Sequence, residues 1–274
     1  FINTVANHKL PVGHALDSCT KEIQEVRLTW GKERTPVVLV DTPGFGDSSR
    51  SDTEVLRLIA KYLVTSRKAG TNLTGLVYMH RISDLKVEVH SRRNFRMFHE
   101  LCGSNNLTQV VVVTTWWDQV DRETARRREE MLRTSETLFK PMVDYGARMM
   151  RHELGSDQGF SSAQAVLNHL LKCNTMDLNI QTQMVKEMRS LPDTSAWEAL
   201  HTDLLPEYRR CLDGLAFVKE ELNRTRDCVR RQALEDERRE LQEEKKAIHK
   251  QIKSLSKNPN ERSVLWRMLS AMGF

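Results

Sequence analysis

Short apolar runs alternate with longer amphipathic stretches along residues 1–172. Apolar runs rich in β-branched residues are typical of strands buried on both faces. They occur at 36–40, 73–79 and 110–114, and a further strand is expected at 22–29. Helical periodicity marks 53–64, 92–101, 122–139 and 163–171. Strands separated by helices of this length predict an α/β fold with a mostly parallel sheet flanked by helices.

The strand pattern stops after residue 172, and the sequence becomes helical and strongly charged. Residues 173–206 are interpreted as a helical linker of short helices and turns. A long, charged amphipathic helix is predicted at 207–255, followed by a short terminal helix at 261–272. The predicted organisation is therefore an α/β domain at 1–172, a linker, and an all-α extension at 207–274.

An apolar stripe runs along the predicted long helix, because every seventh residue from Leu234 to Leu255 is leucine or isoleucine. Arg238 and Lys245 occupy the other seam positions. A strict coiled coil has apolar residues at both seam positions. A single amphipathic helix is therefore favoured, and a coiled coil stays open as the alternative.

Composition excludes several classes of function. The net charge is +5, but basic and acidic residues are interspersed without a long block of one sign, so no nucleic-acid partner is expected. The five cysteines are widely spaced and form no CxxC pair, which argues against a disulfide framework or a zinc site and predicts a cytoplasmic protein. No apolar run approaches the roughly 20 residues of a spanning helix. A peripheral membrane contact by the terminal helix is less favoured than packing against the protein.

The segment Asp41-Thr42-Pro43-Gly44 directly follows a predicted buried strand. An aspartate at the carboxyl end of a strand points into the crevice where α/β sheets bind ligands. It can hold Mg²⁺, usually through water. Gly44 allows the backbone to approach closely enough for its N–H to donate to a phosphate. The segment predicts a magnesium and phosphate site, with an ordinary strand-to-turn junction as the alternative.

A second polar segment, Thr114-Thr115-Trp116-Trp117-Asp118, follows the strand at 110–114. The Asp118 carboxylate can accept from both donors on the Watson–Crick edge of guanine, a donor pair that adenine lacks. Thr115 can make one hydrogen bond, and Trp116 can lay its indole over the purine face. Trp117 is favoured as a packing residue. The segment predicts a site that reads a guanine base.

Thr20 lies in a loop ahead of the strand predicted at 22–29. Its hydroxyl can supply an oxygen to Mg²⁺, and its N–H can donate to a terminal phosphate. A loop threonine alone is weak evidence for a metal ligand. The spacing of Thr20 ahead of Asp41 strengthens this assignment. Thr20 is therefore a candidate both for the metal site and for catalysis.

Taken in order, these segments resemble those of the immunity-associated and septin-like P-loop GTPases, above all the fungal members. The stretches that carry the resemblance are 1–20, 75–84, 98–103 and 114–118. The resemblance covers about residues 1–172 and implies GTP or GDP with Mg²⁺ as cofactors. Thr20 resembles the switch I threonine, Asp41 with Gly44 the switch II pair, and Asp118 the guanine-reading aspartate. Arg151 and His152 sit where family members place residues near the purine.

Family members carry a glycine-rich loop ending in Gly-Lys-Ser/Thr just before the position of Phe1. That loop supplies the backbone cradle and the lysine for the phosphates. The 274 residues contain neither this loop nor the strand that leads into it. The resemblance thus implies a G domain that is cut just after its P-loop.

Hydrolysis is expected to be slow. Ras-type enzymes place a water-orienting glutamine directly after the switch II glycine, and here Phe45 occupies that position. His80 is an alternative candidate for a catalytic group. A packing role in the core or at an interface is favoured for it.

The expected function is a guanine-nucleotide-binding switch with slow or partner-assisted GTP hydrolysis. GTPases that resemble this chain often pair across the nucleotide face. The resemblance therefore leaves a homodimer across this face as an alternative to a monomer. The alternative is a non-catalytic, decayed G domain that acts as an interaction scaffold and binds a protein partner through its C-terminal helix.

Overall fold

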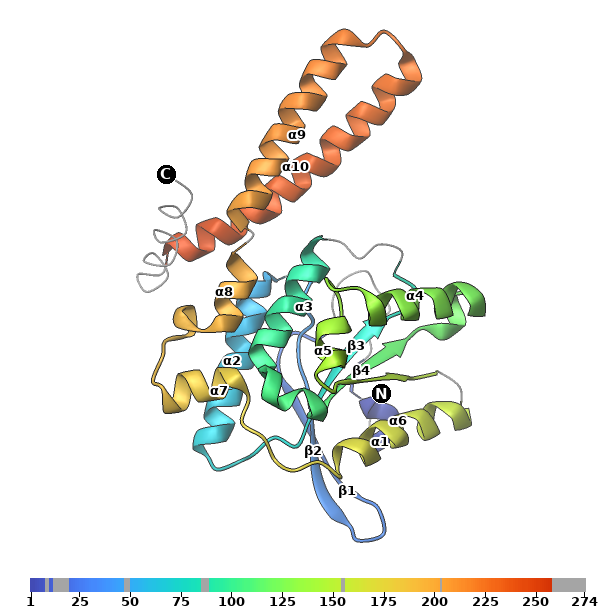
Figure 1. Ribbon diagram of the computed structural model, residues 1–274, viewed down its shortest axis with the longest axis vertical. Coiled ribbons are helices and arrows are strands. Elements are labelled where there is room, and N and C mark those ends of the chain that lie inside the picture. The colour runs from blue at the N-terminus through green and yellow to red at the C-terminus, as the bar shows by residue number, and fades with distance from the viewer. Residues whose placement is uncertain are drawn as a thin grey trace. The chain divides into compact units, whose positions relative to one another are not determined.

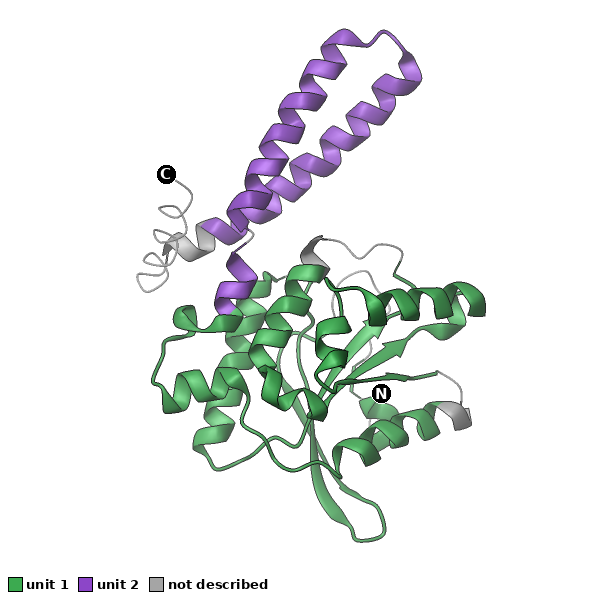
Figure 2. Cartoon of the chain, in the orientation of Figure 1, with its two compact units in different colours: residues 1–196 green, residues 197–274 purple. Residues whose placement is uncertain are grey.

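The computed structural model describes residues 1–7, 10–11, 20–46, 50–84, 89–153, 156–202 and 204–257. The chain forms two compact units, residues 1–196 and residues 197–274 (Figure 2). All strands in the described ranges belong to the first unit. None of the helices in these ranges has the length and apolar character needed to cross a bilayer.

The first unit alternates strands and helices (Figure 1). Its strands are β1 (Gln24–Trp30), β2 (Thr35–Asp41), β3 (Leu76–Arg81), β4 (Val110–Thr115) and β5 (Arg148–Arg151). Its helices are α1 (Ile2–Ala6), α2 (Asp52–Lys68), α3 (Val89–Cys102), α4 (Arg122–Thr134), α5 (Lys140–Asp144), α6 (Ser156–Leu170) and α7 (Asn179–Gln181). Short turns of 3₁₀ helix lie at Ser104–Gln109, Trp117–Gln119 and Leu191–Asp193, and a π turn at Thr182–Lys186. Helix α8 (Ser195–His201) spans the boundary between the units.

The strands form two groups. β1 and β2 pair antiparallel, with Gln24 opposite Asp41. β3, β4 and β5 form a parallel sheet in that order. β4 is the central strand, and all six of its residues are buried, as expected for a strand covered on both faces. The predicted α/β fold with a parallel sheet between helices is therefore confirmed.

Helix α6 packs against both strand groups. Its residues Ala163 and Leu167 join Val37 of β2 in one apolar cluster, while Val166 and Leu170 join valines of β4 in another. Phe1 packs against both clusters. Within the described ranges, β2 and β3 each have one edge without a strand partner. One helix therefore covers two strand groups that are not hydrogen-bonded to each other.

The boundary between the units lies after residue 196, whereas the sequence suggested a boundary after residue 172. Residues following 172 pack onto α2 and α3. The Gln181 side-chain amide donates to the Leu63 carbonyl at 2.9 Å, and that of Asn179 donates to the Glu100 carbonyl at 3.0 Å. These contacts to main-chain carbonyls attach the start of the predicted linker to the α/β unit.

The second unit contains two long helices, α9 (Leu204–Arg224) and α10 (Cys228–Lys257), which lie side by side as a hairpin (Figure 1). The single helix predicted at 207–255 is therefore wrong. It is interrupted at 225–227, where the Asp227 carboxylate accepts the Val229 N–H at 2.9 Å and starts a new helix. Leu234 and Leu241 of α10 pack against the α9 residues Val218 and Leu222. The predicted terminal helix at 261–272 lies outside the described residues.

The sequence predicts that both Arg92 and Arg93, at the start of their helix, face solvent. In the structure Arg93 is buried. Its side chain is fully inaccessible and donates to the Asp52 carboxylate at 3.3 Å, which is itself 5% exposed. Arg92 is exposed. An ion pair buried to this extent links the first turn of α2 to α3.

Candidate nucleotide-binding site

Thr20 and Asp41, which are 21 positions apart in the sequence, meet in the structure. The Thr20 hydroxyl donates to Oδ2 of Asp41 at 3.0 Å. Asp41 is the last residue of β2, and both side chains are half-buried. A hydroxyl and a carboxylate are hard oxygen ligands of the kind that Mg²⁺ takes, with water filling the remaining positions. In the described ranges, no group of three or more His, Cys, Asp or Glu residues could hold a metal. The Thr20 hydroxyl and the Asp41 carboxylate together fit a Mg²⁺ ion whose other ligands are water.

The loop after Asp41 leaves open space at Gly44. Gly44 is exposed, and among the described residues a Cβ at this position would meet no atom within 4 Å. Two residues further on, Gly46 adopts a φ of +81°, a conformation that favours glycine. Its N–H donates to the Asp52 carboxylate at 2.7 Å. Asp52 therefore anchors Gly46, and no described residue fills the space next to the Gly44 Cα.

The turn after β4 carries the predicted base-reading residues. Trp116 is 40% exposed, and the Arg81 guanidinium lies 5.2 Å from its ring centroid. Thr115 is buried, and its hydroxyl donates to the His80 carbonyl at 3.3 Å. Asp118 is exposed and accepts from the Gln119 amide at 2.9 Å. The turn thus presents one indole and one carboxylate to solvent, while the Thr115 hydroxyl contacts the neighbouring strand.

Trp116 has φ +61° and ψ +38°, which is the left-handed conformation. This conformation costs a residue other than glycine about 1–2 kcal/mol. A bulky side chain stays in such a conformation only where surrounding contacts hold it there. The conformation of this turn is therefore fixed by the contacts around it.

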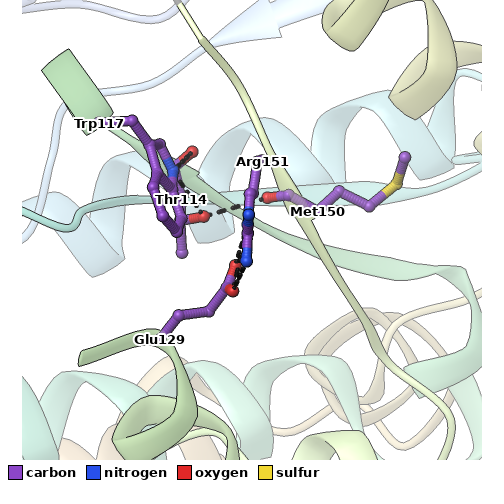
Figure 3. A network of polar contacts seen from close by, with 5 residues as sticks. All are labelled: Thr114, Trp117, Glu129, Met150 and Arg151. Atoms are coloured by element: carbon purple, nitrogen blue, oxygen red, sulfur yellow. Dashed lines mark hydrogen bonds and ion pairs between the residues drawn. The ribbon is translucent and has the colours of Figure 1, made fainter. Parts of the chain in front are cut away.

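Arg151 belongs to a polar network at the same edge of the sheet (Figure 3). Its Nε lies 3.0 and 3.1 Å from the two carboxylate oxygens of Glu129, and Nη2 also donates to Glu129. The guanidinium lies 4.3 Å from the ring centroid of Trp117. The hydrogen bond to Glu129 raises the pKa of Arg151 above its ordinary value. Arg151, expected near the purine, is thus held against the aromatic ring that precedes Asp118.

His80 lies among aromatic side chains. Its ring meets Phe95 and Phe139 edge-on, with centroids 5.8 and 5.9 Å apart. Burial lowers the pKa of His80 below its ordinary value. This environment suits a packed, neutral histidine.

His152 is buried beside the site, at 1% exposure. Its Nδ1 lies 2.9 Å from the Ser162 hydroxyl, its ring contacts Phe1, and its Nε2 has no hydrogen-bond partner in the described residues. Burial lowers the pKa of His152 to about 4. The histidine is therefore neutral at physiological pH.

Stability is expected to fall in acid because of His152. The unfolded pKa of histidine is about 6.5, so the unfolded state binds the additional proton between pH ~6.5 and ~4 and is favoured as pH drops through this window. Between pH 7 and pH 4, wild type should lose roughly 2–3 kcal/mol more unfolding free energy than His152→Gln. Urea unfolding across this range measures the difference. The exposed His249→Gln should follow wild type, and a His152→Gln variant with the wild-type pH slope would contradict the assignment.

No family model and no curated protein sequence matches the chain. Solved structures of chloroplast translocon GTPases do match. Toc33 from Arabidopsis thaliana with Mg²⁺ and GMPPNP is 13% identical over 62% of this chain and 78% of that chain, with a TM-score of 0.48. With GDP and Mg²⁺, Toc33 is 15% identical over 69% and 79%, with a TM-score of 0.46.

A structure of the translocon components atToc33 and psToc159, in which dimerization is described as important for GTPase activity, is 15% identical. The match covers 62% of this chain and 76% of that chain, with a TM-score of 0.47. Identities this low, with TM-scores below 0.5, transfer no ligand or activity to this chain.

Proposed function

We propose that this chain is the larger part of a guanine-nucleotide-binding GTPase domain of the septin-like and immunity-associated type. The observation that carries the proposal is the 3.0 Å contact between Thr20 and Asp41. The sequence pattern selects these two residues as Mg²⁺ ligands from separate segments. Their meeting at the end of β2, beside the open space at Gly44, suits a Mg²⁺–phosphate group.

The phosphate loop of this domain is proposed to lie outside the 274 residues. β2 and β3 each have an unpaired edge in the described ranges, and α6 covers both strand groups. A strand between them would join the two groups into one sheet. A glycine-rich loop at the end of that strand would present the phosphates to Asp41 and Gly44.

Hydrolysis by this domain is proposed to be slow or assisted by a partner. Phe45 follows Gly44 and has no group that can orient a water molecule. Among the described residues of this site, Thr20 is proposed to donate its N–H to the terminal phosphate. A homodimer across the nucleotide face would be one source of the missing group. The cytoplasm is the proposed compartment, since the four cysteines in the described ranges are all free thiols.

The Mg²⁺ dependence of nucleotide binding tests this proposal. In the full-length protein, Asp41→Asn and Thr20→Val should each weaken Mg²⁺-dependent binding of a fluorescent GTP analogue by roughly 10- to 100-fold. Both changes keep the size of the side chain while weakening or removing the oxygen ligand. Binding is measured by titration with Mg²⁺ at a fixed analogue concentration.

Thr42→Val is the matched control, because Thr42 is the exposed neighbour of Asp41. It should leave the Mg²⁺ dependence unchanged. Equal Mg²⁺ dependence in wild type, Asp41→Asn and Thr20→Val would show that these residues do not form the metal site.

An interaction scaffold is the second candidate function. The α9–α10 hairpin exposes large apolar side chains, with Phe217 60% and Val229 80% exposed. A protein partner that covered these side chains would remove their apolar surface from water. This candidate predicts that the full-length protein binds no GTP analogue, with or without Mg²⁺.

A further inference from the structure

A buried carboxylate on α4 is joined to the turn that carries Asp118. Glu129 is 6% exposed, and in the described residues its carboxylate accepts paired hydrogen bonds from Arg151. A carboxylate buried to this extent needs a cationic partner to offset its lost hydration. The planar guanidinium matches both carboxylate oxygens and can stack on an aromatic ring at the same time. Glu129 therefore fixes the plane of Arg151.

Arg151 connects Glu129 to the turn through its contact with Trp117. Its guanidinium lies 4.3 Å from the indole centroid. The indole N–H is shared between the carbonyl and the hydroxyl oxygen of Thr114, both at 3.1 Å. The Thr114 hydroxyl in turn donates to the Met150 carbonyl of β5 at 3.4 Å. Figure 3 shows the resulting chain of contacts from Glu129 to the end of β4.

The two neighbours of Trp117 in the chain are the residues proposed to contact the base. Trp116 is held in a left-handed conformation, and Asp118 is exposed. Neither of these two side chains takes part in the network that fixes Trp117. An indole that is locked on one face by Arg151 and at its N–H by Thr114 holds the backbone of the turn in place. Binding sites gain affinity when their residues are held in the bound geometry beforehand.

We propose that Glu129 and Arg151 are positioning residues that hold the Trp116–Asp118 turn in the conformation needed to receive the base. This inference rests on the proposed function and assigns Arg151 a role through Trp117. The network also gives a reason for burying the Glu129 carboxylate beside an exposed site. Replacing either partner loosens the turn without touching the oxygen ligands Thr20 and Asp41.

The test compares Glu129→Gln with Glu130→Gln, its exposed neighbour on the same helix. Hydrogen exchange of the backbone amides at 115–120 is measured without nucleotide. It should become about 10-fold faster or more in Glu129→Gln and stay at the wild-type rate in Glu130→Gln, because a lost charged hydrogen bond corresponds to about that factor. Affinity for a fluorescent GTP analogue should fall about 10-fold in Glu129→Gln, while its dependence on Mg²⁺ concentration stays unchanged.

Arg151→Lys is the second variant, since it keeps the charge but loses the paired donors. It should show faster exchange at the same amides and a smaller loss of affinity. Unchanged exchange in both variants would overturn the positioning role. Faster exchange with unchanged affinity would also overturn it. If wild type binds no nucleotide, the proposed function fails, and the exchange rates alone decide whether Glu129 and Arg151 hold the turn.

Discussion

Replacing Arg93 with methionine is expected to lower the free energy of unfolding by about 3–5 kcal/mol. The Arg93 side chain is fully buried, and it pairs with Asp52, which is 5% exposed. Removing the arginine leaves the carboxylate buried without this charge partner, and that lost compensation dominates the cost. Denaturant unfolding of wild type and variant measures the difference.

Arg92→Met is the control, because Arg92 precedes Arg93 on α3 and is exposed. Its stability should stay within about 0.5 kcal/mol of wild type. Equal losses for the two variants would show that the buried ion pair does not contribute as described.

The same ion pair connects the core to the candidate site. Asp52 accepts the N–H of Gly46 at 2.7 Å through one oxygen and pairs with Arg93 through the other. Gly46 lies two residues after Gly44, so the loop that faces the proposed phosphate is tied to α3. Loss of Arg93 should therefore also loosen this loop.

The central strand of the sheet and the placing of Thr20 and Asp41 at one site could be predicted from the sequence, whereas the metal site itself stays a prediction. The strand at Val110–Thr115 is a continuous apolar run, and such a run is strongly favoured at the centre of a parallel sheet. Thr20 and Asp41 have side-chain oxygens that suit Mg²⁺, and their order along the chain matches that of GTPases. The strand prediction depends on a local apolar run, whereas the choice of Thr20 depends on its spacing ahead of Asp41.

The burial of Arg93 could not be predicted from its surroundings. Two adjacent arginines at the start of a helix predict two solvent-facing side chains. Only the ion pair with the distant Asp52 explains why Arg93 is buried. The partner of Arg151 is likewise distant in the sequence, since Glu129 lies on α4. Ion pairs between distant segments leave no periodic trace in a sequence.

The hairpin and the last strand were missed for other reasons. Thr225-Arg226-Asp227 has the polar composition of an exposed helical face, and only the capping role of Asp227 marks the break. β5 is four residues long, with arginine at both ends, and has no apolar run to detect. Short edge strands gain their structure from the neighbouring strand, here β4.

Replacing Asp118 with alanine is expected to weaken GTP binding by roughly 100-fold and to leave ATP binding unchanged. The carboxylate is exposed at the end of the turn after β4. Two hydrogen bonds to an ionised acceptor contribute about 3 kcal/mol, which corresponds to this factor. Adenine lacks the donor pair, so its nucleotides lose nothing when the carboxylate is removed.

Selection of guanine over adenine is the central claim, and a competition titration tests it most directly. A fluorescent GTP analogue bound to the full-length protein is displaced with unlabelled GTP or ATP, in wild type and in Asp118→Ala. We predict that GTP displaces the analogue from wild type at roughly 100-fold lower concentration than ATP, and that this preference is lost in the variant. Equal displacement by GTP and ATP from wild type, or an equal loss of both in Asp118→Ala, would contradict the claim.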